Sequence, residues 1–385
     1  MVLVHDSGEA GHRERGRPHR QLLEFIGSVA LGYTARDMAQ KPLHSSISDS
    51  AIDLAENNIR DVLSFAIEYE SRDAAIVVWD GESELSVALT QAYRRCLPDA
   101  RFIEFDPAES DAVLAAFEEL TPGDLVVLIQ STSFRLDAFR IRVELFKRSL
   151  KVIEHPHLAR LAGPEGLIYI DSLAYDRDYY RGVGRALKER IDRAKVAIID
   201  SGGEELHFPQ GLEPAKLNVG DYSELDNVGG QYPIGEVFTE STDLEAVYGR
   251  VRISFFGDRS FSVNKPDHPI TLVVEKGRVT SVIDSTPEFD QVLSNIRTDD
   301  GEVWLRELGF GMNRAFSQER FVSDVGTFER MCGVHVSLGA KHPSFNKPNI
   351  RKKTARHHVD VFVITESVIL DDEVIYGDGA WLVGG

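Results

Sequence analysis

The sequence predicts an α/β protein: a doubly wound, parallel-sheet domain followed by a β-rich α+β domain that carries a metal site. Short, continuous apolar runs alternate with helical segments up to residue 200, a pattern typical of parallel strands covered on both faces. The composition then turns to Gly, Asp and Asn over residues 201–232, and strand-like segments dominate the rest. We therefore expect the α/β domain at 51–215, the β-rich domain at 216–385, and a polar, largely disordered extension and lead-in at 1–50.

The first domain is predicted to begin with a helix and to continue as a β-α-β series. Apolar residues recur at helical spacing over residues 51–69. Strands and helices then alternate, and this order predicts parallel pairing with crossover helices. The expected strands are 74–79, 101–105, 124–129, 151–153 and 195–200, and the expected helices are 86–96, 108–120, 138–148 and 179–194.

The second domain is predicted to consist mainly of strands. Residues 251–256 form one of them. Ile270–Glu275 and Arg278–Ile283 flank Lys276-Gly277, which is a two-residue hairpin signal. A short helix is expected at 287–297, and the strands that follow it carry most of the residues with ligand chemistry.

Length and charge limit the partners. The 385 residues include 62 acidic and 43 basic ones, so the formal net charge is −19. Nucleic acids and anionic membrane surfaces are polyanions, so neither is expected as a partner. The basic run from Lys347 to Arg356 is the main exception; it either binds an anionic group of a substrate or is a solvated loop.

The sequence indicates a cytoplasmic protein. Cys96 and Cys332 lie far apart and form no disulfide framework or Cys-x-x-Cys site, so each is expected to be a buried small hydrophobe in a reducing compartment. No apolar run approaches the length of a membrane span. Residues 1–20 carry charges and histidines where a signal peptide needs an apolar core.

Histidine and aspartate side chains occur in two strand-like segments of the second half. Residues 357–363 alternate like a strand, which places His358 and Asp360 on the same face. Two ligand-type side chains at this spacing can hold one metal ion. His335 lies in another apolar, strand-like run, which ends at Gly339.

Two glutamates add carboxylates to this set. Glu236 opens the segment Gly-Glu-Val-Phe-Thr at 235–239. Glu307 precedes Gly309 and Gly311, which we expect to form a turn. Two Glu, two His and one Asp together suit borderline divalent metals such as Zn, Co, Mn or Fe.

The first domain carries weaker candidates. Gly81 follows a strand, but the sequence shows no Gly-x-Gly-x-x-Gly pattern there, so a dinucleotide site is not expected. Ser131-Thr132-Ser133 either contacts a ligand at the end of a strand or caps a helix. Glu154-His155-Pro156-His157 is either a metal-binding pair near an interface or a loop with a structural proline.

The second-half segments together resemble the aminopeptidase T and aminopeptidase S metallopeptidases, a leucyl aminopeptidase-like family. The resemblance covers roughly residues 50–385 and is carried by Gly-Glu-Val-Phe-Thr, Glu-Leu-Gly-Phe-Gly-Met-Asn, Val-His-Val-Ser-Leu-Gly and His-x-Asp, in the family's order. It implies two divalent ions (Zn, Co or Mn), removal of residues from the N-termini of peptides, and a homodimer. On the family's pattern the metal ligands are Glu236, Glu307, His335, His358 and Asp360.

One position departs from the family's pattern, and it bears on peptidase activity more than on metal binding. The family has a catalytic tyrosine shortly after the ligand histidine, but residues 339–346 contain none. His342 is the nearest polar candidate; it either donates to a developing oxyanion or is a loop residue. The implied mechanism uses metal-activated water, with Glu307 or Glu236 as bridging ligand and proton shuttle.

Two other functions suit the same residues. Ring-cleaving 2,5-dihydroxypyridine dioxygenases resemble this family but use one Fe(II), which His335, His358 and Asp360 would hold as a two-histidine, one-carboxylate triad. The extra carboxylates of Glu236 and Glu307 favour a second cation, and therefore the peptidase. The third alternative is a non-catalytic peptide-binding protein of a peptide-tailoring pathway.

Overall fold

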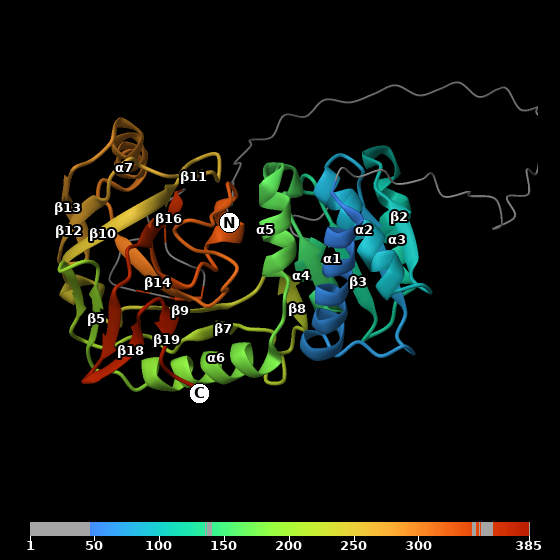
Figure 1. Ribbon diagram of the computed structural model, residues 1–385, viewed down its shortest axis with the longest axis horizontal. Helices are drawn as coiled ribbons and strands as arrows, with labels where there is room; N and C mark the ends of the chain where they lie inside the picture. Colours follow the sequence, from blue (N-terminus) through green and yellow to red (C-terminus); the bar gives the residue numbers. More distant parts are fainter. Residues whose placement is uncertain are drawn as a thin grey trace, which may run out of the picture. The chain divides into compact units, whose positions relative to one another are not determined.

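A computed structural model describes residues 47–134, 136, 141–340, 344–345, 347 and 357–384 (Figure 1). Within these residues a five-stranded parallel sheet with helices is followed by a large antiparallel sheet, which confirms the predicted fold class. The predicted N-terminal extension lies outside the described residues, and so do His342 and all of the basic run except Lys347.

The first sheet is parallel throughout. Its order is β2-β1-β3-β4-β8. β1 and β3 are buried along their whole length, as expected for apolar strands that are covered on both faces. The strands are β1 (Ala75–Trp79), β2 (Arg101–Glu104), β3 (Leu125–Ile129), β4 (Lys151–His155) and β8 (Gly229–Gln231).

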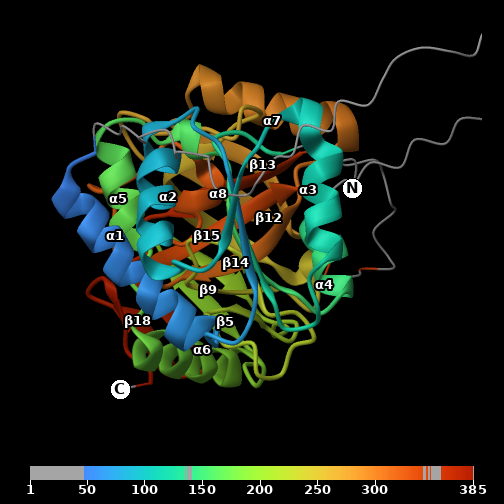
Figure 2. The same ribbon diagram turned by 90° about the vertical axis from the view of Figure 1, so that its right-hand side faces the viewer.

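Helices lie on both sides of the parallel sheet (Figure 2). On one side are α1 (Asp49–Asp61), α2 (Glu84–Cys96) and α5 (Pro164–Ser172), and α1 contacts both of the others. On the other side are α3 (Ser110–Glu118) and α4 (Ile141–Lys147).

Alternation along the strands explains these two layers. Val77 and Val127 belong to the apolar core that also contains residues of α1 and α2. Ile76 and Val126 belong to a second core with residues of α3 and α4. Successive side chains of a strand point to opposite faces, so one continuous apolar run supplies both cores.

The second sheet is antiparallel and contains fourteen strands among the described residues. Its main path is β19-β18-β17-β5-β6-β10-β16-β15-β14-β9-β7, with β11 and the β12–β13 hairpin joined to β10. The strands are β5 (Ala197–Asp200), β6 (Glu205–Phe208), β7 (Lys216–Asn218), β9 (Glu236–Glu240), β10 (Tyr248–Gly257), β11 (Val263–Asn264), β12 (Ile270–Glu275), β13 (Arg278–Ile283), β14 (Leu305–Gly311), β15 (Gly333–Gly339), β16 (His358–Val363), β17 (Ser367–Leu370), β18 (Glu373–Gly377) and β19 (Ala380–Trp381).

The predicted hairpin between β12 and β13 is confirmed. Lys276 and Gly277 connect the two strands, and both have positive φ, at 51° and 71°. Two consecutive positive φ values are typical of the tight turn that matches the twist of paired antiparallel strands.

Three parts of the chain differ from the prediction. β5, predicted as a fifth parallel strand, pairs antiparallel with β6 and β17, because a four-residue apolar run does not distinguish the two sheet types. The Gly-, Asp- and Asn-rich residues 201–232 contain β6, β7 and β8, and β8 returns to the parallel sheet. α5 was not predicted. The division into domains at residue 215 stays a prediction.

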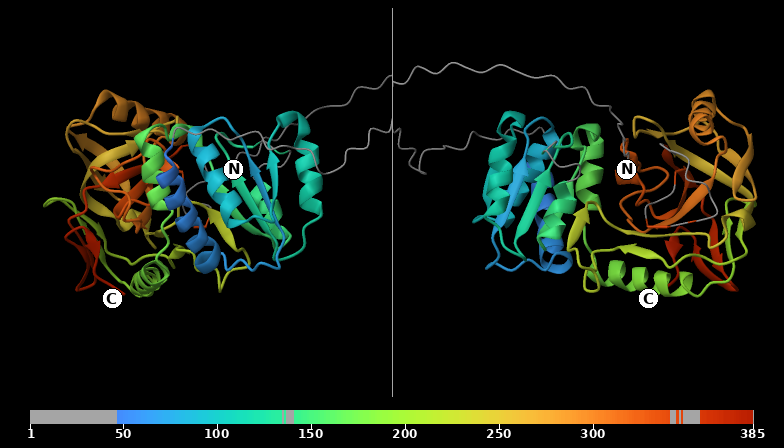
Figure 3. Two further views of the ribbon diagram at one scale, coloured as in Figure 1. Left: turned by 45° about the vertical axis from the view of Figure 1, so that its right-hand side comes forward. Right: turned by 180° about the vertical axis from the view of Figure 1, so that it is seen from behind.

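The remaining helices lie beside the antiparallel sheet or between its strands. α6 contacts β7 and β9, and the C-terminus lies beside it in Figure 3; a Cβ on Gly384 would lie 2.9 Å from the Cα of Val183. No helix of the described residues is long and apolar enough to span a membrane. These helices are α6 (Arg177–Ile191), α7 (Pro287–Asp300) and α8 (Val325–Phe328). Of the short helical turns, η1 (Val62–Ala66), η2 (Pro107–Glu109) and η3 (Leu158–Arg160) contact α1, α3 and α2 respectively, and η4 (Leu244–Ala246) lies between β9 and β10.

Candidate metal centre

Four neighbouring strands bring the predicted ligands to one face of the antiparallel sheet. The strands lie in the order β16-β15-β14-β9. Side chains along a strand alternate between faces, so the register decides which of them meet. The relevant pairs are Gly311 with Glu236, Gly309 with His335, and Ser337 with Asp360.

Glu236, Glu307 and His335 form the centre of the site. His335 Nε2 lies 3.3 Å from Glu236 Oε1 and 3.9 Å from Glu307 Oε1. One ligand atom from each of the three residues lies within 4.8 Å of the other two. All three side chains are buried, and a buried charge needs a partner or a metal.

The hydrogen bonding of these atoms fits a metal ion. His335 Nε2, Glu307 Oε2 and Asp360 Oδ1 are buried and make no well-aligned hydrogen bond among the described residues. His335 Nε2 and Asp360 Oδ1 do lie at ion-pair distance, 3.3 Å from Glu236 Oε1 and 3.2 Å from His358 Nε2. Leaving a buried polar atom unsatisfied costs about 1–3 kcal/mol, so several such atoms in one place make it a candidate site for a bound ion. Oxygen and imidazole nitrogen are the donor types that Zn²⁺, Mn²⁺ and Co²⁺ accept in proteins.

His358 and Asp360 extend the site along β16. His358 Nε2 lies 3.2 Å from Asp360 Oδ1; Asp360 is buried, whereas the side chain of His358 is partly buried, with 35% of it exposed. His358 Nδ1 lies 3.1 Å from the carbonyl oxygen of Ala340, to which it donates. A backbone acceptor on one ring nitrogen fixes the imidazole and leaves the other nitrogen available to a metal ion. The predicted pairing of these two residues on one strand face is therefore present.

Gly309 and Gly311 do not form the turn that was predicted; both lie inside β14. A Cβ on Gly309 would lie 2.0 Å from the ring of His335, so the imidazole occupies the space that a side chain would fill. A Cβ on Gly311 would lie 1.9 Å from the carbonyl oxygen of Met331. At both positions glycine allows another group to approach the strand closely, and it does not reverse the chain.

The carboxylates raise the pKa of both histidines. Burial alone would lower the pKa of His335, but Glu236 and Glu307 outweigh it and raise the value to about 10. Burial likewise opposes a rise at His358, whose pKa Asp360 brings to about 9. Both imidazoles therefore carry a proton at neutral pH unless a metal displaces it.

The same contacts keep the carboxyls ionised. Burial raises the pKa of Glu236, but the contact with His335 and the charge of Arg330 outweigh it and hold the value below its usual range. At Asp360, burial is likewise outweighed by His358, with further contributions from His335 and Arg330. The site thus presents anionic oxygens, as a cation requires.

A buried ion pair lies next to this cluster. Arg306 Nε pairs with Glu240 Oε1, and Glu240 stands opposite Glu307 in the register of β9 and β14. Both side chains are almost inaccessible to solvent, at 4% and 1%. Arg306 Nη2 and Glu240 Oε2 have no hydrogen-bond partner among the described residues. The cluster of unsatisfied polar atoms therefore extends along β14.

His342, the predicted substitute for the family's tyrosine, lies outside the described residues. Lys347 is the one described residue of the basic run, and its ammonium pairs with Glu213 and donates to the carbonyl oxygen of Thr242. Lys347 is therefore used within the fold, and the two alternatives for the rest of the run stay open.

The histidine candidate of the first domain is structural. His155 is buried, with Nε2 2.8 Å from the Tyr93 hydroxyl and Nδ1 2.8 Å from the Tyr169 hydroxyl. Tyr169 donates its only proton to the carbonyl oxygen of Tyr232, so Nδ1 must donate to Tyr169 and Nε2 must accept from Tyr93. Both ring nitrogens are occupied, which excludes the predicted alternative of a metal pair with His157.

The serine candidate of the first domain serves the fold as well. The backbone N–H of Ser131 donates to Asp80 Oδ2 at 2.7 Å, and its hydroxyl donates to the Ser83 hydroxyl at 2.8 Å. Ser131 is fully buried. It joins the loops after β1 and β3 and also supports the cap of α2, which favours the capping alternative.

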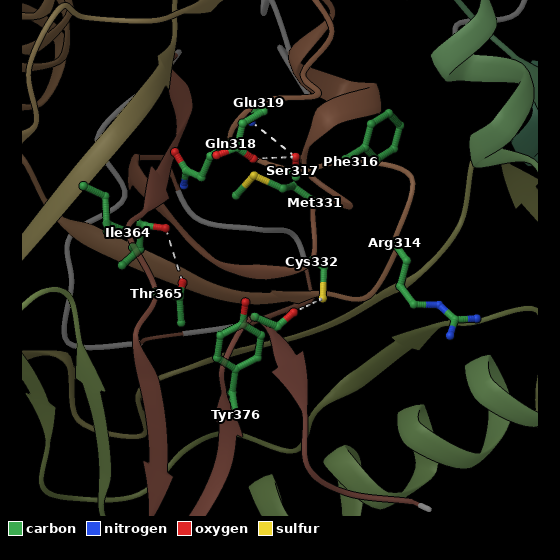
Figure 4. A pocket seen from close by; sticks show the side chains of 12 residues that line it. Arg314, Phe316, Ser317, Gln318, Glu319, Met331, Cys332, Ile364, Thr365 and Tyr376 are labelled. Atoms are coloured by element: carbon green, nitrogen blue, oxygen red, sulfur yellow. Dashed lines mark hydrogen bonds between the residues drawn. The ribbon is translucent and has the colours of Figure 1, made fainter.

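A cavity of about 350 Å³ lies at the start of β15 and the end of β16 (Figure 4). None of the five predicted ligands lines it. Its polar groups stabilise the fold: Thr365 Oγ1 accepts from the Val334 N–H, and Cys332 Sγ lies 3.7 Å from the Gly379 carbonyl oxygen. Burial raises the pKa of the Cys332 thiol to about 11. Cys332 and Cys96 are half-buried, not fully buried as predicted.

Sequence reasoning missed three charged side chains beside the site: Glu240, Arg306 and Arg330. Glu240 could have been found, because it follows Glu236 by four residues in a strand and therefore shares its face. Arg306 stands in a strand that is buried throughout, where a charge needs a partner. Arg330 lies between a short helix and a strand and carries no pattern signal.

The sequence matches no family model and no curated protein. The fold, however, is similar to two solved enzyme structures. 2,5-Dihydroxypyridine dioxygenase from Pseudomonas putida KT2440 aligns with a TM-score of 0.57 and 16% identity, over 86% of this chain and 97% of the other. AmpT from Thermus thermophilus aligns with a TM-score of 0.51 and 14% identity, over 86% of this chain and 99% of the other. At these identities the likeness shows a shared fold, and it confirms at that level the structural resemblance predicted from the sequence.

Proposed function

We propose that this protein is a metal-dependent, aminopeptidase-like hydrolase that removes residues from the N-termini of peptides. The observation that supports this proposal is the convergence of Glu236, Glu307 and His335, whose ligand atoms lie within 4.8 Å of one another in a buried site. Two glutamates beside one histidine exceed what a single two-histidine, one-carboxylate centre uses, and they favour more than one cation.

We assign a role in this proposed reaction to each of the five predicted ligands. Glu236, Glu307, His335, His358 and Asp360 would hold two divalent ions, which would supply Lewis acidity and a water of lowered pKa. Glu307, whose Oε2 has no hydrogen-bond partner among the described residues, would accept the proton of the attacking water and deliver it to the leaving amine. Burial of Glu236 and Asp360 excludes water from their charges and strengthens their electrostatic contribution.

A second candidate is a mononuclear iron dioxygenase. It is favoured by the His358–Asp360 contact of 3.2 Å on β16, next to His335 on β15, which supplies two imidazoles and one carboxylate. The fold likeness to 2,5-dihydroxypyridine dioxygenase is compatible with it. In that case Glu236 and Glu307 would have no cation of their own to neutralise.

Elemental analysis and paired activity assays test the proposal. We expect about two Zn, Co or Mn ions per chain and hydrolysis of L-aminoacyl p-nitroanilides. Glu307→Gln should reduce kcat by roughly 100- to 10,000-fold without changing the fold, because it removes the proton acceptor. Glu275→Gln, at an exposed strand end, is the matched control and should retain full activity.

Other outcomes would contradict the proposal. One Fe per chain with oxygen uptake on 2,5-dihydroxypyridine favours the dioxygenase. No bound metal and no turnover favours a non-catalytic peptide-binding protein. Full peptidase activity in Glu307→Gln would remove Glu307 from its proposed role. The proposed homodimer is checked separately by sedimentation of the intact chain.

A further inference from the structure

Arg330 lies at the edge of the metal centre on a segment that comes from outside the central strands. A Cβ on Gly311 would fall 2.8 Å from the carbonyl carbon of Arg330 and 1.9 Å from the carbonyl oxygen of Met331. Gly311 is paired with Glu236 in the sheet. The missing side chain of Gly311 therefore allows the backbone of Arg330 to rest on the ligand-bearing face, beside Glu236.

The guanidinium of Arg330 is buried but incompletely bonded. Its exposure is 5%. Nη1 donates to the carbonyl oxygen of Gly326 at 2.6 Å and pairs with Glu329, both on its own segment. Nε has no hydrogen-bond partner among the described residues. A buried guanidinium with a spare N–H is costly unless another group accepts from it.

The charge of Arg330 acts on the ligands without forming an ion pair with them. Burial lowers its pKa, and Glu236 and Asp360 are the first two groups that oppose this lowering. A positive charge here repels metal ions, so it does not assist metal binding. With two divalent ions in place the carboxylates are already outnumbered by positive charge, and the guanidinium adds to the surplus. A bound anion would balance this surplus of positive charge.

We infer that Arg330 binds an anionic carboxylate group of the substrate next to the metal ligands. This inference rests on the proposed two-metal site. A guanidinium recognises carboxylates through charge-assisted N–H donors, and the unpartnered Nε supplies one. The substrate class is then a small amino compound with a carboxylate close to its metal-binding amine, such as a dipeptide or an amino acid derivative, rather than the end of a long chain.

Calorimetric binding of L-leucine and L-leucinol to the zinc-loaded protein tests this inference without turnover. The two ligands share the amine and the side chain, and only leucine carries a carboxylate. Leucine should bind about 10- to 100-fold more tightly in the wild type, as expected for a charge-assisted hydrogen bond. Arg330→Met should remove this difference, and Arg330→Lys should restore part of it. Arg314→Met, an exposed arginine that pairs with Asp176, is the control and should keep it.

Zinc affinity of the leucine-free protein gives a second readout. Arg330→Met should bind Zn²⁺ more tightly than the wild type, because a repelling charge is removed. A purely structural arginine would instead weaken zinc and leucine binding together, and that result would overturn the inference. If Arg330→Met does not fold, Arg330→Lys decides: the inference requires a several-fold loss of leucine affinity with leucinol binding unchanged.

The inference and the proposed function fail in different ways. Leucine binding that depends on Arg330, without hydrolysis of any peptide, would support the inference and contradict the peptidase. Peptide hydrolysis with equal binding of leucine and leucinol would support the peptidase and overturn the inference, leaving Arg330 as a counter-charge to the buried carboxylates.

Discussion

Each of the two sheets buries a histidine almost completely, and the two imidazoles are perturbed in opposite directions. In the parallel sheet, His155 is held between the hydroxyls of Tyr93 and Tyr169, and burial lowers its pKa to about 3. In the antiparallel sheet, His335 meets two glutamates, which raise its pKa to about 10. Equal burial therefore gives opposite chemistry, because the neighbours are neutral in one case and anionic in the other.

The same difference distinguishes polar groups that serve the fold from those of the candidate metal centre. Both ring nitrogens of His155 have hydrogen-bond partners of the right donor and acceptor type. By contrast, His335 Nε2, Glu307 Oε2 and Asp360 Oδ1 make no well-aligned hydrogen bond among the described residues, although the first and third lie at ion-pair distance from Glu236 and His358. Native proteins satisfy nearly all their buried polar groups, so a concentration of exceptions makes this place a candidate binding site.

The largest effect is expected at the Arg306–Glu240 pair, which lies buried beside the candidate metal centre. Arg306→Met should lower the free energy of unfolding by about 3–5 kcal/mol, because Glu240 is left as an uncompensated buried charge. Urea denaturation of the metal-free protein measures this change. Adding Glu240→Leu should recover most of the loss, since replacing both charges by apolar groups is close to neutral.

The exposed pair Arg190–Glu373 is the matched comparison. Arg190→Met should change the free energy of unfolding by less than about 1 kcal/mol. If Arg306→Met also changed the free energy of unfolding by less than about 1 kcal/mol, the buried carboxylate of Glu240 would not need Arg306 as its counter-charge. That result would contradict the prediction.

A smaller effect is expected in the parallel sheet. His155→Phe removes both hydrogen bonds and leaves the buried Tyr93 hydroxyl without its partner, so we expect a loss of about 1–3 kcal/mol. Zinc affinity should not change, because His155 is structural. Thermal unfolding with and without Zn²⁺ separates the two statements, and a variant that lost zinc binding would show that the two sheets are coupled.

The effects of pH have opposite signs in the two regions. The pKa of His335 is raised from 6.5 to about 10, so its contribution to stability is complete below pH 6.5 and is lost as the pH rises towards 10. The pKa of His155 is lowered from 6.5 to about 3, so its contribution is complete above pH 6.5 and is lost as the pH falls towards 3. Metal-free protein should therefore be most stable on these two terms near pH 6.5.

Denaturation of the metal-free protein across this pH range checks the prediction. His335→Gln, which loses its contacts with Glu236 and Glu307, should flatten the alkaline decline. Loading with Zn²⁺ should abolish the same decline, since a bound metal replaces the proton on the imidazole. An unchanged alkaline limb in both experiments would show that His335 is not protonated in the metal-free state.

Much of the fold was predictable because it depends on local patterns. The runs that became β1 and β3 are short, apolar and bounded by helical segments, and the Lys276-Gly277 turn specifies its hairpin directly. The sheet to which β5 belongs was not predictable, because its four residues fit either sheet. Of its two partners, β6 follows it closely in sequence, whereas β17 lies far away. Long-range pairing of this kind leaves no local signal.

Part of the candidate site was predictable, from strand periodicity and from the family resemblance. His358 and Asp360 share a face as their spacing requires, and Glu236 and Glu307 meet His335 as the resemblance implies. The sequence did not show that His335 would lie across Gly309, where a turn was expected. That contact depends on the register between β14 and β15, which single-chain patterns do not specify.

The gap left by Gly309 has a consequence for recognising such centres in other chains. One added methyl at this position would collide with the His335 ring at 2.0 Å, although no coordinating atom would have been altered. A chain could thus retain every residue that donates a ligand atom and still be unable to bind the ion. A search for such sites should therefore consider the small residue on the neighbouring strand, which leaves space for the imidazole, as well as the ligands.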